Sequence, residues 1–446
     1  MTRAVAAAGD GAVTWSAPLY EPGGTREYYP SPAMVEAISR RDGERITASE
    51  LRRFAGDDGR LRRSPSPLAA VLRGRTLDGG ELLVRQAVLD RQRGRAVGPG
   101  HRRWAAVSML RARRSSAFTE WDGNLASLAV NGRVGLPRVV SPTSLEQYTA
   151  CGFRYFCRSL LRLNVVEEPD EREMMDAAAR GDLIHRILDD FFKTQKARGR
   201  PGVGESWTRE DRAELIAVTR ARLAEAKERG LTGLDVYAEH EQRMILADLT
   251  RFLEEDSLFR LETGAVPSEF EQEIPEVEIA GVKLRGRVDR IDRSPDGTRA
   301  WVIDYKTGSS REFDKMSEDP LVGGRKLQLP VYLAAAEGAK ESVALYWFIT
   351  NKGGFQRFPY ERTPELNERF ERTLLAILRG IESGSFPAVS DEEEEYYGKH
   401  ANCRFCDFDR ICSRRREYEF AAKQGDLAFV PWLGVADAAR KKEDGR

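Results

Sequence analysis

The sequence lacks the patterns that mark several common enzyme classes. It has four His and no Ser in a G-x-S-x-G turn, so a hydrolase triad has little support. The motifs GxxxxGK[ST] and GxGxxG are both absent, which disfavours an ATP-driven motor and a dinucleotide-dependent enzyme. No apolar run reaches the length of a membrane span, and Met1–Gly11 shows no apolar leader. We therefore expect a cytoplasmic protein with no membrane partner.

Lysine is scarce and the charge is unevenly distributed. The 71 basic residues balance 71 acidic residues, so nucleic-acid binding would have to come from local charge. Only 13 of the basic residues are Lys, which makes a Lys beside a carboxylate notable. Residues 1–120 contain 21 Arg and no Lys against 13 acids. This Arg-rich stretch is either a solvated helical surface or a path for nucleic acid.

The order of predicted elements indicates an α/β domain with a mixed sheet. Apolar residues first recur at helical spacing and then at a period of two, which is typical of strands. A helix, a strand and a long helix follow these strands. Helices are predicted over 145–160, 171–196, 208–229, 235–256, from 326, and over 363–384. Strands are predicted over 269–274, 277–282, 284–293, 299–305 and 343–350.

The segment LRGRVDRIDRSPDGTRAWVIDYKTG, residues 284–308, carries the strongest chemical signal. It predicts two adjacent strands joined by a turn, with Asp304 and Lys306 on one face and Asp289 near the level of Asp304. Two converging carboxylates repel each other unless a cation lies between them, and Mg²⁺ prefers carboxylate oxygens. A nearby Lys stabilises charge that develops on a phosphate. Asp292 is the competing carboxylate, but it faces the other side of the strand.

Three further residues are candidates for the same site. His185 lies in an apolar helix, where it is either a core residue or a metal ligand if the helix docks over the carboxylates. Gln328 and Tyr332 are four apart and share one helix face, which suits either ordinary packing or a place beside the site.

The cysteines form a local metal-site pattern. Cys403-x₂-Cys406-x₅-Cys412 needs a fourth ligand, which Cys151 or Cys157 would supply. Spacing alone favours zinc because zinc sites are common, but four thiolates suit an iron–sulfur cluster equally well.

Taken in order, the motifs GDLIHRIL, GRVDRID, VIDYKTG and KLQLPVY resemble the RecB-type branch of the PD-(D/E)XK nucleases over roughly residues 139–415. That resemblance implies a mixed sheet flanked by helices and DNA cleavage with Mg²⁺ or Mn²⁺. It assigns metal binding to His185, Asp289, Asp304 and the Tyr305 carbonyl. It also implies that Lys306 is the catalytic lysine, and that Gln328 and Tyr332 form the QxxxY signature.

A second resemblance concerns the cysteines. The helix SPTSLEQYTACGFRYF, followed by three Cys after the core, is similar to the AddB-type nuclease subunit. This resemblance implies a [4Fe–4S] cluster and a buried, non-ligating Cys157. The implied ligands are Cys151, Cys403, Cys406 and Cys412. Gly152 stands where that group usually has Pro.

The resulting prediction is a metal-dependent DNA nuclease, expected to be an exonuclease acting on single strands or duplex ends in double-strand break processing. The predicted regions are an Arg-rich part over 1–135, for which a helicase-like remnant is one interpretation, a nuclease domain over 136–420 and a tail over 421–446. A helicase subunit is an expected partner. The alternatives are a CRISPR-adaptation-type iron–sulfur nuclease and a non-catalytic module that binds DNA ends.

Overall fold

The computed structural model describes residues 30–54, 85–86, 88–90, 93, 104–128, 139–164, 173–279, 281–390, 393–394, 399–403 and 406–439. Two compact units make up the chain, Met1–Trp104 and Ala105–Arg446. Much of the Arg-rich region and the basic end at residues 440–442 lie outside the described residues.

The described residues of the first unit include two short helices with a small core. Helix α2 (Pro32–Asp42) begins after Ser31, whose hydroxyl accepts the Met34 N–H, and ends at Gly43 in the left-handed conformation. Helix α3 spans Ala48–Phe54. A buried apolar cluster joins the two helices, and it consists of Met34, Ile38, Ile46 and Leu51.

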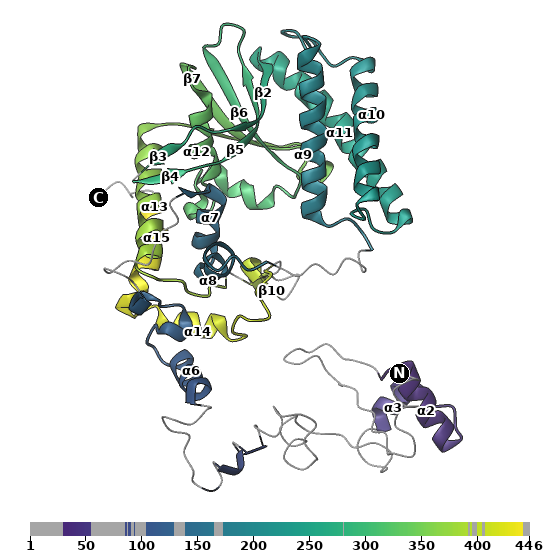
Figure 1. Cartoon of the computed structure of the whole chain (residues 1–446), viewed down its shortest axis with the longest axis vertical. Coiled ribbons are helices and arrows are strands. Elements are labelled where there is room, and N and C mark those ends of the chain that lie inside the picture. Colours follow the sequence, from purple (N-terminus) through teal and green to yellow (C-terminus); the bar gives the residue numbers. More distant parts are fainter. Residues whose placement is uncertain are drawn as a thin grey trace. The chain divides into compact units, whose positions relative to one another are not determined.

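The remaining helices and strands lie between residues 104 and 439 (Figure 1). The helices are α6 (Trp104–Arg114), α7 (Pro142–Ala150), α8 (Gly152–Tyr155), α9 (Ala177–Ala197), α10 (Arg209–Glu228), α11 (Asp235–Thr263), α12 (Gln328–Tyr332), α13 (Pro364–Glu382), α14 (Arg416–Lys423) and α15 (Val430–Ala439). The strands are β1 (Val139–Val140), β2 (Val266–Glu273), β3 (Val277–Ile279), β4 (Val282–Leu284), β5 (Arg287–Arg293), β6 (Arg299–Lys306), β7 (Glu341–Phe348), β8 (Arg357–Glu361), β9 (Glu393–Glu394) and β10 (Lys399–His400).

A five-stranded mixed sheet organises the second unit. Its strand order is β2-β5-β6-β7-β8, and only the β6–β7 pair is parallel. A small sheet of order β1-β4-β3 and a β9–β10 pair accompany it. The structure therefore confirms the predicted α/β fold with a mixed sheet flanked by helices.

Helices cover both faces of the sheet, so β6 is buried along almost its whole length (Figure 1). On one face, Trp301, Ile303 and Tyr305 pack in a core with apolar residues of α9 and α11. On the other face, Ala300 and Val302 pack with residues of α7, α12 and α13. Because β6 alternates its side chains between the two cores, Asp304 and Lys306 follow Ala300 and Val302 toward α7 and α12.

Four predicted elements differ from those observed. The helix predicted over 145–160 is broken at Cys151 between α7 and α8, and the strand predicted over 277–282 ends at Ile279, with Val282 already in β4. The strand predicted over 284–293 is divided between β4 and β5, and Gly286 stands at the break. A Cβ atom on Gly286 would lie 2.6 Å from Cε1 of Tyr332, so only glycine lets that ring pack there. The helix predicted from residue 326 is the five-residue α12, followed by a 3₁₀ turn over Leu333–Ala336.

A buried ion network fixes β5 to α11 on the face opposite Asp304. Arg290 and Asp292 are fully buried, and the Arg290 guanidinium pairs with Asp292 and with Asp256 of α11. Arg260 donates to the second oxygen of Asp256, so two cations face two carboxylates. Arg290 also lies within 3.3 Å of the Tyr305 hydroxyl. Asp292, the competing carboxylate of the sequence pattern, is thus engaged in this network.

Removing one member of this network should strongly destabilise the fold. Arg290→Met leaves the buried Asp292 carboxylate without its paired cation and removes one of the two cations at Asp256. We expect a loss of about 3–5 kcal/mol in the free energy of unfolding. The matched control is Arg293→Met on the same strand, because Arg293 pairs with Glu269 at a partly exposed site and should cost less than about 1 kcal/mol. Urea unfolding measures both variants. Equal losses of stability in the two variants would contradict the structural role assigned to Arg290.

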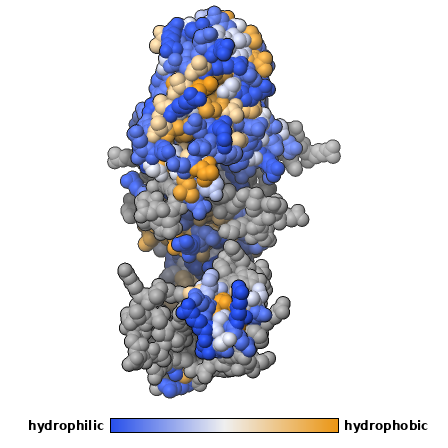
Figure 2. Space-filling model, turned by 90° about the vertical axis from the view of Figure 1, so that its right-hand side faces the viewer, coloured by the Kyte–Doolittle hydropathy of each residue, from blue (hydrophilic) through white to orange (hydrophobic). Residues whose placement is uncertain are grey.

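The side of the molecule nearest α10 is mainly hydrophilic, with apolar patches between polar side chains (Figure 2). Exposed apolar residues near the start of α11 include Leu234, Val236 and Tyr237. Among the described residues, no helix is both long and apolar enough to cross a bilayer.

Candidate active site

The β5–β6 hairpin brings Asp289 and Asp304 to the same level. Arg290 pairs with Ile303 in the antiparallel register, so the next position along places Asp289 beside Asp304. Asp289 Oδ2 accepts the backbone N–H of Tyr305 at 2.6 Å, which ties the side chain of one strand to the backbone of the other. The two carboxylates therefore converge near the centre of the sheet.

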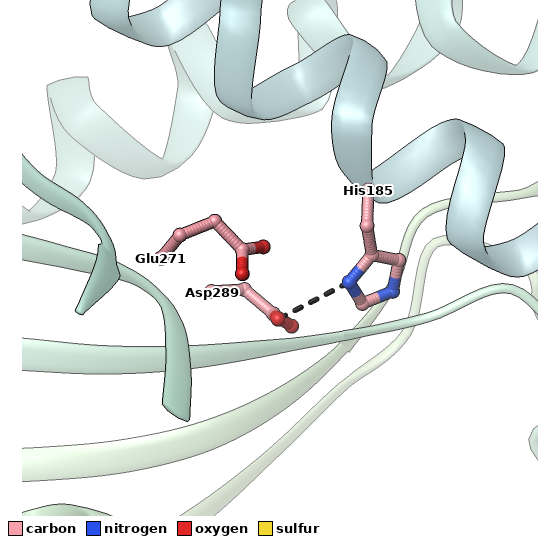
Figure 3. A group of neighbouring side chains, drawn as sticks. All are labelled: His185, Glu271 and Asp289. Atoms are coloured by element: carbon pink, nitrogen blue, oxygen red, sulfur yellow. Dashed lines mark hydrogen bonds and ion pairs between the residues drawn. The ribbon is translucent and has the colours of Figure 1, made fainter. Parts of the chain in front are cut away.

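Helix α9 delivers an imidazole to Asp289. Asp176 caps the start of α9, and the apolar residues of the helix, including Ile184 and Ile187, are buried against the sheet. This docking places Nδ1 of His185 3.1 Å from Oδ1 of Asp289 (Figure 3). Burial lowers the pKa of His185, but the Asp289 carboxylate outweighs that effect and raises the pKa to about 9.

Glu271 of β2 completes this group, although no sequence motif points to it. One potential ligand atom from each of His185, Glu271 and Asp289 lies within 4.8 Å of the others, and Figure 3 shows the three side chains converging. The register explains why, because Phe270 and Gln272 pair with Arg290 and Val288, on either side of Asp289. A pattern of acids in the strand predicted over 269–274 was visible, but it did not single out Glu271.

The backbone and charge at Glu271 are both unusual. Its φ of 48° lies in the left-handed region, which a residue with a Cβ seldom adopts. Burial raises the pKa of Glu271, and the Asp289 carboxylate raises it further. A hard cation would offset this repulsion, and a set of carboxylates with one imidazole suits Mg²⁺ or Mn²⁺. Among the described residues, this is the one group of His, Cys, Asp or Glu with such spacing.

Asp304 and Lys306 stand beside the group of three. Burial raises the pKa of Asp304, Lys306 opposes the rise, and Asp289 adds to it. Asp304 forms an ion pair with the Lys306 ammonium, and its charge also acts on His185. Asp304 is not part of the 4.8 Å group with His185 and Asp289, although its charge interacts with both. Tyr305, between Asp304 and Lys306, directs its ring to the opposite face.

Lys306 is held by residues of α12. Its Nζ donates to Gln328 Oε1 at 3.0 Å and lies 4.8 Å from the centre of the Tyr346 ring. The Gln328 amide in turn donates to the Tyr332 hydroxyl at 3.4 Å. Gln328 and Tyr332 thus share one polar chain with Lys306, which places them at the site and not only in the packing around it.

Comparison with protein families agrees with this geometry. The model of the family described as "PD-(D/E)XK nuclease superfamily" matches residues 139–413. The chain belongs to the PD-(D/E)XK nuclease superfamily. The match spans all five strands of the central sheet and every residue of the candidate site, together with Cys151, Cys403, Cys406 and Cys412.

Two other comparisons add little to this assignment. Comparison with curated proteins found no match. Among solved structures, the crystal structure of SSO0001 is similar over 61% of this chain and 95% of that chain, with 17% identity and a TM-score of 0.20. The superfamily assignment therefore rests on the family match.

The cysteines of this PD-(D/E)XK protein gather in one region. Cys151 lies at the break between α7 and α8, and Asn402, next to Cys403, donates to the Ala150 carbonyl at 2.8 Å. Burial raises the pKa of Cys151 to about 11, and the nearby Cys412 and Cys406 contribute to the rise. Cys157 is also buried and is affected by Cys406 and Cys412 in the same way. Cys151 and Cys157 therefore both lie close enough to Cys406 and Cys412 for their charges to interact.

Gly152 is explained by close backbone contact. A Cβ atom there would lie 2.8 Å from the Cα of Phe386 and 2.9 Å from its carbonyl carbon. The Phe153 N–H donates to the Pro387 carbonyl at 2.9 Å, which holds the two segments together. A residue with a Cβ, proline included, would push α8 away from residues 386–387 in this structure.

The His185–Asp289 pair should make the stability of the metal-free protein depend on pH. The pKa of His185 is raised to about 9 from an unfolded value of about 6.5. The pair therefore stabilises the fold fully below pH 6.5, and this contribution disappears as the pH rises through 9. We expect the difference in Tm between wild type and His185→Gln, measured with a chelator, to shrink across that range. A difference that does not change with pH would contradict the assigned pair.

Proposed function

We propose that the chain is a DNA nuclease that requires Mg²⁺ or Mn²⁺ and hydrolyses phosphodiester bonds. One observation carries the proposal: His185, Glu271 and Asp289 converge next to the Asp304–Lys306 ion pair. Acidic oxygens for a divalent cation and an ammonium group for a phosphate thus meet at one point of the sheet. A non-catalytic module that binds DNA ends would not need this complete set.

Each residue has a part in the proposed reaction. When bound, a divalent cation polarises the scissile phosphate and lowers the pKa of a water molecule. His185, Glu271 and Asp289 would hold that cation, with Asp304 at its border. The Lys306 ammonium offers positive charge to the phosphate oxygens, while Asp304 and Gln328 fix its position. The buried strand β6 keeps these groups rigid, so little reorganisation accompanies the reaction.

The substrate class is tested by direct cleavage. The purified chain is incubated with end-labelled single-stranded DNA, blunt duplex and covalently closed circular DNA, each with Mg²⁺, with Mn²⁺ or with a chelator. We expect linear DNA to be degraded only when metal is present. Resistance of the circle would support exonuclease action, and cleavage of the circle would support an endonuclease. Absence of cleavage on every substrate would refute the proposed activity.

We also propose that Cys151, Cys403, Cys406 and Cys412 hold a [4Fe–4S] cluster. The support is the similarity of the helix before Cys151 and of the three later Cys to the AddB-type nuclease subunit. Contacts between the Ala150 and Asn402 segments bring the two parts of the motif together, and soft thiolates suit iron–sulfur chemistry. Zinc remains the alternative that metal analysis distinguishes.

The wider role we propose is the processing of DNA double-strand breaks for recombinational repair, with a helicase as partner. The support is the motif resemblance over the nuclease core and the helix that leads to Cys151. In this role the Arg-rich residues before position 135 would contact phosphates, and DNA binding would weaken steeply as salt increases. A pull-down with helicase subunits tests the partnership.

A further inference from the structure

Helix α7 carries a glutamate whose contacts reach the start of α12. Glu146 Oε1 accepts the backbone N–H groups of Leu327 at 2.5 Å and Gln328 at 3.2 Å. The first N–H groups of a helix have no partner within the helix, and Leu327, at the N-cap of α12, has no side chain that could cap it. Glu146 therefore supplies from another element the acceptor that α12 lacks.

The same helix also contacts the side chain that holds Lys306. Thr143, three residues before Glu146 on α7, accepts from Gln328 Nε2 at 3.2 Å. Gln328 Oε1 accepts from the Lys306 ammonium at 3.0 Å. Helices α7 and α12 are in contact, and both lie on the sheet face toward which Lys306 points (Figure 1). Gln328 is thus fixed by α7 at both its backbone and its amide.

We propose that Glu146 is a positioning residue for the nuclease reaction, acting through the start of α12 and Gln328 on Lys306. The inference rests on the proposed nuclease function and adds a residue to it. A carboxylate at a helix start stabilises the first turn, so losing it releases Gln328 and lets the ammonium drift. A misplacement of about 1 Å in a reacting group can cost roughly a hundredfold in rate.

The charges around Glu146 are consistent with a functional role for its contact with α12. Burial raises the pKa of Glu146 to about 7, against the lowering effect of the Leu327 N–H and of Lys326 and Lys306. The half-buried Glu146 carboxylate thus interacts with two lysines and two backbone N–H groups, as expected of a residue that holds the start of α12 in place.

A double-mutant cycle tests the inference. Glu146→Ala should lower kcat about tenfold and leave KM for DNA unchanged. Glu146→Gln keeps an acceptor of the same length and should recover most of the loss. In a Gln328→Ala background, Glu146→Ala should lower kcat by less than about twofold more, because both residues act through one path. Glu365→Ala, at the exposed start of α13, is the matched control and should behave as wild type.

A second measurement does not depend on cleavage. Acylation of the Lys306 amine, followed by mass spectrometry, should be several times faster in Glu146→Ala than in wild type or Glu146→Gln. In the Gln328→Ala background, Glu146→Ala should not change the rate. If Glu146→Ala changed kcat or the labelling rate by the same factor in the wild-type and Gln328→Ala backgrounds, the inference would be overturned. If the wild type cleaves no DNA, the proposed function fails while the labelling result still decides the role of Glu146.

Discussion

Asp304→Asn should reduce metal-dependent DNA cleavage by about three orders of magnitude while the protein stays folded and still binds DNA. The substitution keeps the shape of the side chain but removes its charge. The Asp304 charge acts on His185 and Asp289 and pairs with the Lys306 ammonium. The substitution therefore removes negative charge beside the proposed cation and takes away the ion-pair partner of the lysine. Single-turnover cleavage of end-labelled DNA measures the loss, and filter binding in a chelator measures DNA affinity.

The same hairpin offers a matched control for this prediction. Asp296 lies in the exposed turn between β5 and β6, where it accepts from Ser294 and Thr298. Asp296→Asn makes the identical chemical change away from the site and should cleave DNA at the wild-type rate. If Asp304→Asn and Asp296→Asn degrade DNA equally well, the site is wrongly placed. A matching loss of DNA binding in Asp304→Asn would point instead to a binding defect.

The second large effect is expected at the cysteines. Cys406→Ala should abolish the bound iron and the broad absorption near about 400 nm that accompanies thiolate ligation of iron. The proposed cluster links Cys151 to Cys403 across 252 positions of sequence. By the chain-entropy formula for cross-links, such a link contributes on the order of 5 kcal/mol to the free energy of unfolding. We therefore expect a fall in Tm of the purified variant together with the loss of colour.

Cys157→Ala is the natural control, because Cys157 is buried in the same region but is not a proposed ligand. This variant should keep its iron and its colour, with a small change in Tm. Loss of iron in Cys157→Ala, with iron retained in Cys151→Ala, would exchange the roles of these two residues. A colourless wild type that contains one zinc per chain would overturn the iron–sulfur proposal.

The elements of the fold were largely predictable because their signals are local. The apolar run Trp301–Ile303 predicted β6, and apolar residues at helical spacing predicted the helical segment that contains α7. The sequence did not predict β8, and it joined β4 to β5. These failures share one cause, since a short edge strand and a break at Gly286 depend on their neighbours, including the Tyr332 ring that only glycine admits.

The candidate site was predictable only in part. Asp289, Asp304 and Lys306 could be placed together because a hairpin and a two-residue spacing relate them along the chain. Glu271 could not be found in this way. Its position depends on the pairing of β2 with β5, and its direction depends on an unusual backbone angle that no sequence pattern encodes.

The sequence alone determined the fold class, the superfamily motifs and the residue types available for metal and phosphate chemistry, since composition, periodicity and spacing are properties of the chain itself. Tertiary structure decided which of these residues meet. Docking of α9 brings His185 to Asp289, pairing of β2 adds Glu271, and α7 reaches Gln328 through Glu146. These contacts join segments far apart in the sequence, and only the packing of helices against a formed sheet fixes the distances between them.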